Sequence, residues 1–229
     1  MDTSTPKAAL AVMAASGGVF TAAPSASARH GRVLVPAIQE LLARAGISVR
    51  DLDGVLIGLG PGSYTGVRIG LTAAKTLAYA TSKPLIGFDS LGLIARNVPD
   101  DALHVSVIAD AQRGDVYTAS FTRDAPGSRL EPVSPTRVVA LTEWSASLSD
   151  GSFVLGPAFG VERIAKALSL PASVRRPGDA HSDWPDPRRL VALTHDAWRS
   201  GRRVDPWYLE PVYLRRSAAE DQWDRRVGS

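Results

Sequence analysis

Cysteine is absent from the 229 residues of this chain. Its absence excludes disulfide bonds, thiolate metal sites and a cysteine nucleophile, and it agrees with a reducing compartment. The sequence also lacks any apolar run near the roughly 18 residues that a membrane span requires. The segment Met1–Lys7 has neither the basic start nor the apolar core of a signal peptide. We therefore expect a cytoplasmic protein.

An excess of either charge is also missing, because 26 Lys and Arg residues stand against 23 Asp and Glu residues, a formal net charge of +3. Pairs of arginines after residue 171 suggest a nucleic-acid surface, but acidic residues in the same region nearly balance them. A solvated surface of mixed charge is the better interpretation. The length allows one large domain or two small ones, and either can bury a substantial core.

What is present is organised around residues 55–81, which predict a strand, a glycine-rich loop and a helix. The apolar run Val55–Leu59 is typical of a buried strand, and apolar residues recur at helical spacing after Gly66. Either Ser63 or Thr65 can cap this helix. A strand, loop and helix in this order indicate an α/β sheet.

Three known motifs that glycine-rich turns can carry do not fit this loop. A P-loop fails because Val67 and Arg68 follow Gly66 in place of Lys and Ser or Thr. A dinucleotide fingerprint fails because Ser63 occupies the position of the later glycine, and a nucleophile elbow fails because this serine is not centred between glycines. For a glycine-rich loop in general, the preferred interpretation is a tight turn between strand and helix that binds no ligand of its own.

Further elements follow from apolar runs and their periodicity. We expect strands at residues 8–13, 19–23, 85–88, 104–110 and 115–121, and helices at 32–45, 65–81 and 90–96. The last two strands flank a short turn and form a hairpin. Ser90 is expected to cap the third helix, and residues 97–101, with a proline and two acids, mark a subdomain boundary.

The motif Gly-Pro-Gly-Ser-Tyr-Thr-Gly-Val-Arg-Ile-Gly at residues 60–70 resembles the signature of the TsaB family, which belongs to the bacterial machinery that makes threonylcarbamoyladenosine in tRNA. The likeness continues at residues 73–78, 84–91, 110–117 and 210–215, and so covers most of the chain. The signature loop consists of Gly60, Pro61, Gly62, Ser63, Tyr64, Thr65 and Gly66.

The resemblance implies an α/β fold of the actin and sugar-kinase-like (ASKHA) superfamily with two ribonuclease-H-like subdomains. These would comprise residues 1–100, which bind a partner, and a smaller part at 101–216, with 217–229 as a disordered tail. In the family an apolar strand leads into the sequence that is Asp2–Thr5 here. We therefore expect a first strand truncated at the N-terminus, and either a natural start upstream of Met1 or a chain that is unstable alone.

The sequence contains few residues that could bind a metal or take part in catalysis. In the catalytic paralogue of the family, two histidines four residues apart hold a metal. Leu34 stands four residues after His30, and His104, His181 and His195 have no ligand-like spacing to it. Carboxylates near strand ends are the remaining candidates, and turn or cap roles are the preferred interpretation for them: Asp2, Asp89, Asp110 and Asp115. We expect no catalytic residue, no metal site and no cofactor.

By resemblance, the chain is a non-catalytic subunit that supports a TsaD-like, metal-bearing paralogue and helps to recruit a TsaE-like ATPase. It would meet tRNA only indirectly and would not contact a membrane. A homodimer through the same surface stays open. The alternative is an autonomous nucleotide-dependent phosphotransferase or a metallopeptidase-like enzyme. The expected partner surface lies on the first two helices and consists of Val33, Leu34, Ala37, Ile38, Leu41, Leu42, Gly66, Gly70, Ala73, Ala74 and Leu77.

Overall fold

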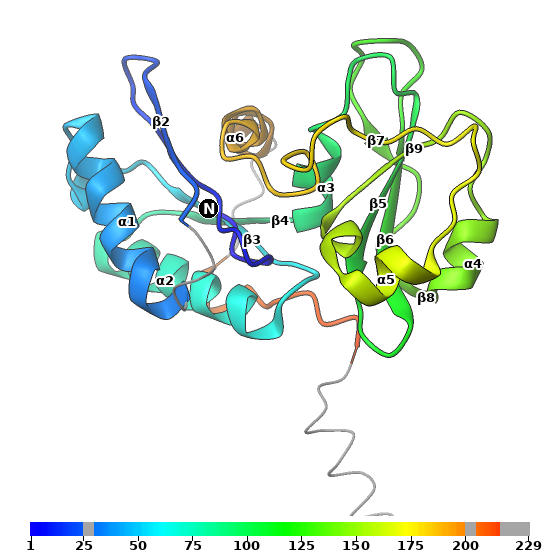
Figure 1. The fold of residues 1–229 in the computed structure, drawn as a ribbon. Helices are drawn as coiled ribbons and strands as arrows, with labels where there is room; N and C mark the ends of the chain where they lie inside the picture. The colour runs from blue at the N-terminus through cyan, green and yellow to red at the C-terminus, as the bar shows by residue number, and fades with distance from the viewer. Residues whose placement is uncertain (25–29, 200–204, 216–229) are drawn as a thin grey trace, which may run out of the picture.

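The computed structural model describes residues 1–24, 30–199 and 205–215 (Figure 1). The strands are β1 (Leu10–Met13), β2 (Val19–Ala22), β3 (Val55–Gly58), β4 (Leu85–Phe88), β5 (His104–Asp110), β6 (Asp115–Thr122), β7 (Glu131–Pro132), β8 (Arg137–Ala140) and β9 (Phe153–Leu155). The α-helices are α1 (His30–Ala45), α2 (Tyr64–Thr81), α3 (Ser90–Ala95), α4 (Leu141–Ala146), α5 (Glu162–Ala167) and α6 (Arg189–Arg199).

The first half of the chain is layered around two short strand pairs. Strands β1 and β2 are antiparallel, and β3 and β4 are parallel. Side chains alternate between the two faces of β3. Val55 and Ile57 pack with residues of α2, while Leu56 packs with Leu190 of α6. Figure 1 accordingly shows α1 and α2 on one side of these strands and α6 on the other.

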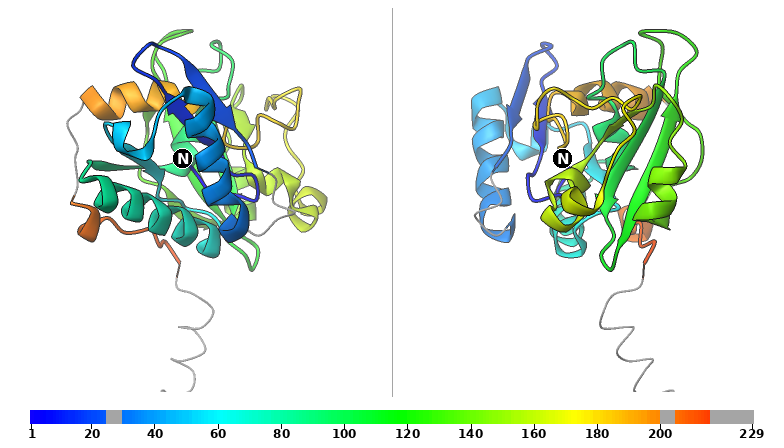
Figure 2. Two further views of the ribbon diagram at one scale, coloured as in Figure 1. Left: turned by 90° about the vertical axis from the view of Figure 1, so that its left-hand side faces the viewer. Right: turned by 45° about the vertical axis from the view of Figure 1, so that its right-hand side comes forward.

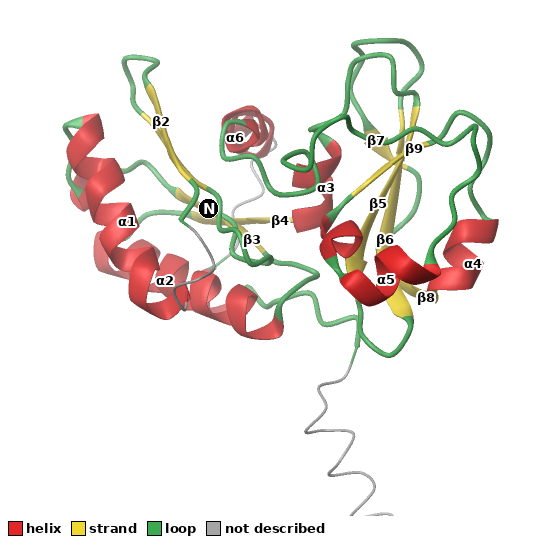
Figure 3. Cartoon of the chain, in the orientation of Figure 1, coloured by secondary structure: helices red, strands yellow, loops and turns green. Residues whose placement is uncertain are grey.

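The second half is built on one larger sheet, in the order β7-β6-β5-β9, with β8 also paired to β6. Strands β5 and β6 form the antiparallel hairpin that the sequence predicts. Val107 of β5 packs in the same cluster as Ile94 of α3, while Ile108 packs with Trp144 of α4 on the opposite face. The mixture of helices and strands in both halves is visible in Figure 3.

Most predicted elements agree with the observed ones within one or two residues. The differences are at element ends; α1, for example, begins at His30, two residues before the predicted start. The helix α6 and the segment 205–215 follow the second half in sequence but pack on the first, through Leu190 and Leu209. The boundary near residue 100 stays a proposal, and residues 217–229 lie outside the described residues. No described helix is both long and apolar enough to cross a membrane.

Met1 and Asp2 join the two strand pairs of the first half. The backbone of Asp2 exchanges two hydrogen bonds with Ala9, of 2.8 and 2.9 Å. On the other side, the Met1 amine donates to the Leu56 carbonyl at 2.7 Å, and the Gly58 N–H donates to the Met1 carbonyl at 3.0 Å. This pattern is antiparallel toward β1 and parallel toward β3. The expectation of an upstream start stays a prediction.

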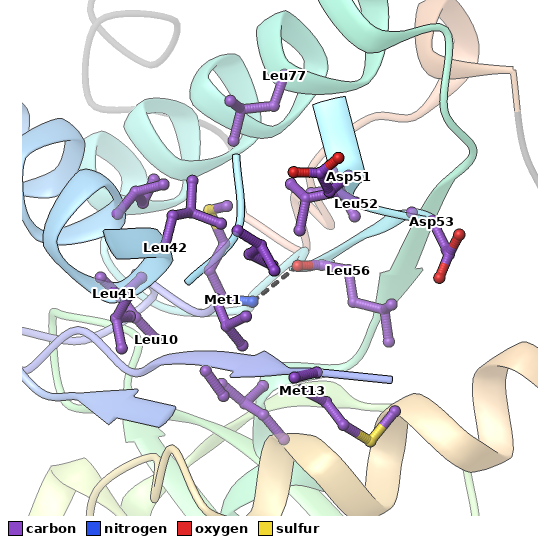
Figure 4. Close-up of a pocket in the computed structure, with 18 of the residues that line it drawn as sticks. Met1, Leu10, Met13, Leu41, Leu42, Asp51, Leu52, Asp53, Leu56 and Leu77 are labelled. Atoms are coloured by element: carbon purple, nitrogen blue, oxygen red, sulfur yellow. Dashed lines mark hydrogen bonds between the residues drawn. The ribbon is translucent and has the colours of Figure 1, made fainter. Parts of the chain in front are cut away.

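An apolar cavity of about 410 Å³ continues the line of Met1 between β1 and β3 (Figure 4). Leu10 and Val12 line one side, Leu56 another, and Leu42 of α1 and Leu77 of α2 also contribute. Figure 4 shows Leu10, Leu42, Leu56 and Leu77 around Met1, whose amine donates the hydrogen bond to Leu56 that is drawn. The cavity therefore has the lining and the neighbouring strand edges that an added β-strand needs.

Residues added before Met1 are therefore expected to stabilise the fold when they can occupy this space as a strand. Four apolar residues, Val-Ile-Leu-Val, should raise the free energy of unfolding by about 1–3 kcal/mol, because burial of apolar side chains exceeds the cost of ordering. Urea denaturation measures the change. A Gly-Ser-Gly-Ser extension is the control and should give no gain; equal stability of the two extended chains would contradict the prediction.

The buried Met1 amine also predicts a pH dependence. Burial lowers its pKa from 8.0 to about 6, against the opposing charge of Asp2. Between these values the unfolded chain binds the proton and the folded chain does not, so stability is lost as pH falls from 8 to 6. The expected loss is about 2–3 kcal/mol. Urea denaturation across this range measures it. The Gly-Ser-Gly-Ser extension moves the amine into solvent, and a dependence that persists there must come from other groups.

Candidate interaction site

The signature loop connects β3 to α2 and begins the helix. The Ser63 hydroxyl accepts the Gly66 N–H at 3.1 Å, so Ser63, and not Thr65, is the cap. The Ser63 N–H donates in turn to the Ser4 carbonyl at 2.6 Å. Gly60 has φ of +89°, which glycine adopts without the strain other residues incur. The turn thus holds its helix against the N-terminal segment.

Four glycines of this region lie against the segment Asp2–Ser4. A Cβ atom on any of them would overlap atoms of that segment: at Gly58 the Asp2 carboxylate, at Gly62 the Ser4 carbonyl, at Gly66 the Thr3 carbonyl and at Gly70 the Thr3 hydroxyl. The Thr3 hydroxyl also donates to the Gly66 carbonyl at 2.8 Å. The glycines therefore permit a close approach of protein to protein, which supports the interpretation of the loop as a turn without a ligand.

The acidic candidates of the second half are held in ion pairs. Asp110 accepts the Arg163 guanidinium, and its carboxylate also accepts the Gln112 N–H at 2.6 Å. Asp115 pairs with Arg215 at 3.0 Å, and the same guanidinium donates to the carbonyl oxygens of the turn between β5 and β6. Both carboxylates thus hold structural elements together, as the turn interpretation expects.

The acidic candidates of the first half also have structural partners. Asp2 is fully buried; one of its carboxylate oxygens accepts both the N–H and the hydroxyl of Ser4, and the other has no hydrogen-bond partner. Asp89 accepts the Gly92 N–H at 2.8 Å and the Thr136 hydroxyl at 2.7 Å. Desolvation of its carboxylate raises the pKa of Asp89, while these hydrogen bonds oppose the change. The prediction of Ser90 as the cap of α3 is wrong: Asp89 is the cap.

A cleft of about 800 Å³ lies between the signature loop and the turn that joins β5 and β6. Ser63, Tyr64 and Thr65 line one wall, and Gln112 and Arg113 line the other. These two residues of the turn have positive φ, 66° and 55°. Within the described ranges, no three His, Asp or Glu side chains gather where they could share a metal ion. Both polar and apolar residues line the cleft. No sequence motif in the described walls specifies a ligand for it.

The two histidines whose surroundings the structure describes, His104 and His181, make separate contacts. His104 faces the Thr122 hydroxyl at 3.4 Å, and the His181 backbone donates to Asp179. His30 begins α1, with Leu34 buried one turn later.

The predicted partner surface divides into two groups. One group is buried in the chain's own core: Leu34, Leu41, Leu42, Gly66, Gly70 and Ala74. The other is half-buried: Val33, Ala37, Ile38, Ala73 and Leu77. Because Leu34 and Leu41 pack directly with Leu10 of β1, a substitution there tests folding before it tests binding.

The outer side of the α1–α2 pair carries a residue that the sequence analysis missed. Gly31 lies next to Ile69, since a Cβ on the glycine would be 3.9 Å from the isoleucine Cδ1. Val35 stands one turn after Gly31 and is 52% exposed, so it flanks the seam between the helices. Figure 2 shows α1 and α2 together on the outside of the molecule, facing the viewer on the left. Helical spacing relative to Gly31 is the signal that could have identified Val35.

Comparison with known proteins identifies relatives of this chain. It is 33% identical over 199 residues to the tRNA threonylcarbamoyladenosine biosynthesis protein TsaB of Bacillus subtilis, covering 85% of this chain and 83% of that one. The chain belongs to the TsaB family. The TsaB of Escherichia coli is 28% identical, over 87% of this chain and 85% of its own. Residues 8–147 match the family model of TsaD, tRNA N6-adenosine threonylcarbamoyltransferase.

Solved structures agree with this family. A crystal structure from Pseudomonas aeruginosa, described as an uncharacterized protein with similarity to peptidase YEAZ, superposes with a TM-score of 0.78 at 26% identity, over 93% of this chain and 97% of that one. A second structure, YeaZ from the same organism, has a TM-score of 0.76 at 25% identity. The predicted α/β fold of the ASKHA superfamily is thereby confirmed, as is the resemblance to the TsaB family.

Alanine substitutions at two helical glycines are expected to change stability in opposite directions, because only one of the glycines lies against the segment Asp2–Ser4. Gly70→Ala should destabilise the protein by about 1–3 kcal/mol, because the new methyl group overlaps Thr3. Gly92→Ala in α3 is the matched control: its nearest neighbour would be at 3.7 Å, so the helix should gain up to about 1 kcal/mol. Urea denaturation of both variants measures the difference. Equal changes in stability would show that the close contact with Thr3 does not contribute to stability.

Proposed function

We propose that this chain is a non-catalytic subunit of the complex that synthesises threonylcarbamoyladenosine in tRNA. It would bind and support a TsaD-like, metal-bearing threonylcarbamoyltransferase in the cytoplasm. Membership of the TsaB family carries this proposal, and its relatives are named as tRNA threonylcarbamoyladenosine biosynthesis proteins, which gives the pathway. The ion pairs of Asp110 and Asp115 support a structural role for both carboxylates, because each one holds an arginine from another part of the chain.

The partner surface that we propose is the outer side of α1 and α2. Its half-buried members include Ala37 and Ala73, which pack in the same cluster, and its exposed member is Val35. The buried members, such as Leu34 and Gly70, would act by holding the two helices in place. Burial of a few aliphatic side chains there would contribute several kcal/mol before the costs of association. A TsaE-like ATPase would join this complex, and a homodimer through the same surface would compete with it.

An autonomous enzyme remains the second candidate, favoured by the 800 Å³ cleft between the two halves. It predicts hydrolysis of ATP or of a peptide by the isolated chain, lost in Asp110→Ala.

A charged residue at Val35 is expected to weaken the complex with the paralogue without unfolding the chain. Val35→Glu should raise the dissociation constant at least tenfold, because the carboxylate loses solvent on binding without a partner. Isothermal titration of the purified paralogue measures the affinity, and the melting temperature checks the fold. Val133→Glu is the control, since Val133 is also an exposed valine, at 63%, but lies after β7 in the second half.

Unchanged affinity in Val35→Glu, with binding intact, would move the interface away from α1. Turnover by the isolated chain would instead support the autonomous enzyme.

A further inference from the structure

Large aromatic side chains are exposed on α2 and on the segment 205–215 that runs beside it. Tyr79 and Trp207 are each 74% exposed, and Tyr208 is 79% exposed. Tyr64 and Tyr213 are nearly half exposed. Exposed rings gathered in one region indicate a binding surface more often than single exposed hydrophobic residues do.

Helical spacing places the α2 members of this group on one line. Tyr64, Arg68, Lys75 and Tyr79 fall within about 60° of each other around the helix axis. The first and last are fifteen residues apart, or roughly 22 Å along the helix. The two cations lie between the two rings. No acidic residue occurs in α2.

The segment 205–215 adds a second ring at each end of this line. The ring of Tyr213 is 5.2 Å from that of Tyr64, and the ring of Trp207 is 6.1 Å from that of Tyr79. In Figure 1 the segment follows α2 and continues toward the turn between β5 and β6. We call the resulting surface the aromatic strip: Tyr64, Arg68, Lys75, Tyr79, Trp207 and Tyr213.

The charges of the strip are held beside its rings. The Arg68 guanidinium carbon lies 3.9 Å from the centre of the Tyr64 ring, and its Nε donates to the Tyr213 hydroxyl at 2.6 Å. The Lys75 ammonium donates to the Trp207 carbonyl at 3.4 Å. The acids of the neighbouring segment are Asp205, which accepts the Trp207 N–H, and Glu210. Arginine and lysine therefore lie between the rings, with the acids on the segment beside them.

We propose that the aromatic strip binds single-stranded RNA, with bases stacked on its rings and phosphates near Arg68 and Lys75. Proteins that hold unpaired nucleotides combine positive charges along the backbone path with aromatic rings on which the bases stack. The naming of RNA rests on the proposed function, whose substrate is tRNA. The strip would bring RNA directly to this chain, in contrast to the expectation of an indirect contact.

The test uses the chain alone and a fluorescein-labelled RNA of twelve uridines, with binding followed by anisotropy. The double variant Tyr79→Ala, Trp207→Ala should weaken binding at least tenfold, since each stacked base contributes roughly a five- to hundredfold effect. Lys75→Glu should also weaken binding and reduce the slope of log affinity against log salt by about 0.7. Lys166→Glu, an exposed charge reversal on α5, is the matched control and should bind as the unmodified chain does.

Three results would overturn the proposal. The first is no binding of the RNA by the unmodified chain. The second is an affinity that the double variant shares with the unmodified chain. The third is a double variant that keeps its melting temperature but loses the complex with the paralogue, which would assign the strip to a protein partner. The paralogue titration with Val35→Glu is independent of the RNA, so failure here leaves the proposed subunit role standing.

Discussion

The close packing of Asp2–Ser4 against the glycines of β3, the signature loop and α2 is the contact on which the rest of the first half depends. Side chains at Gly62, Gly66 and Gly70 would displace that segment, and the segment in turn joins β1 to β3 through Met1 and Asp2. Since α2 takes its position from these contacts, so does every surface on it. The signature therefore describes a packing requirement within the chain, and this packing sets the position of α2.

The strand, loop and helix at 55–81 could be predicted because their signal is local: an apolar run, glycines and a helical period. The role of the glycines could not, since their partners lie more than fifty residues away in sequence. The same limit explains the division of the predicted partner surface. Leu34 and Val35 are both apolar, and only the position of β1 decides that the first is buried and the second exposed. At α3, Asp89 and Ser90 are both good capping residues, and the structure selects the aspartate.

The segment 205–215 connects the two halves, in addition to the packing of α3 against β5. Arg215 reaches the turn between β5 and β6, where it donates to two carbonyl oxygens and pairs with Asp115. Three residues earlier, the Val212 N–H donates to the Leu59 carbonyl next to the signature loop. The segment 205–215 thus links α2 to the second half along the edge of the cleft. Arg215 therefore anchors this segment to the second half through the Asp115 carboxylate and the turn.

One helix then has three sides with three different tasks. Ala74 and Ala78 of α2 are buried against β3 and β4, Ala73 meets α1 at the seam proposed for the partner, and Lys75 and Tyr79 belong to the aromatic strip. These residues are close in sequence but point in different directions because successive positions turn by about 100° around the axis. A rotation of α2 would therefore move the partner seam and the aromatic strip together. Any loss of the contacts that Thr3 makes with Gly66 and Gly70 should weaken both surfaces at once, although Thr3 itself is fully buried.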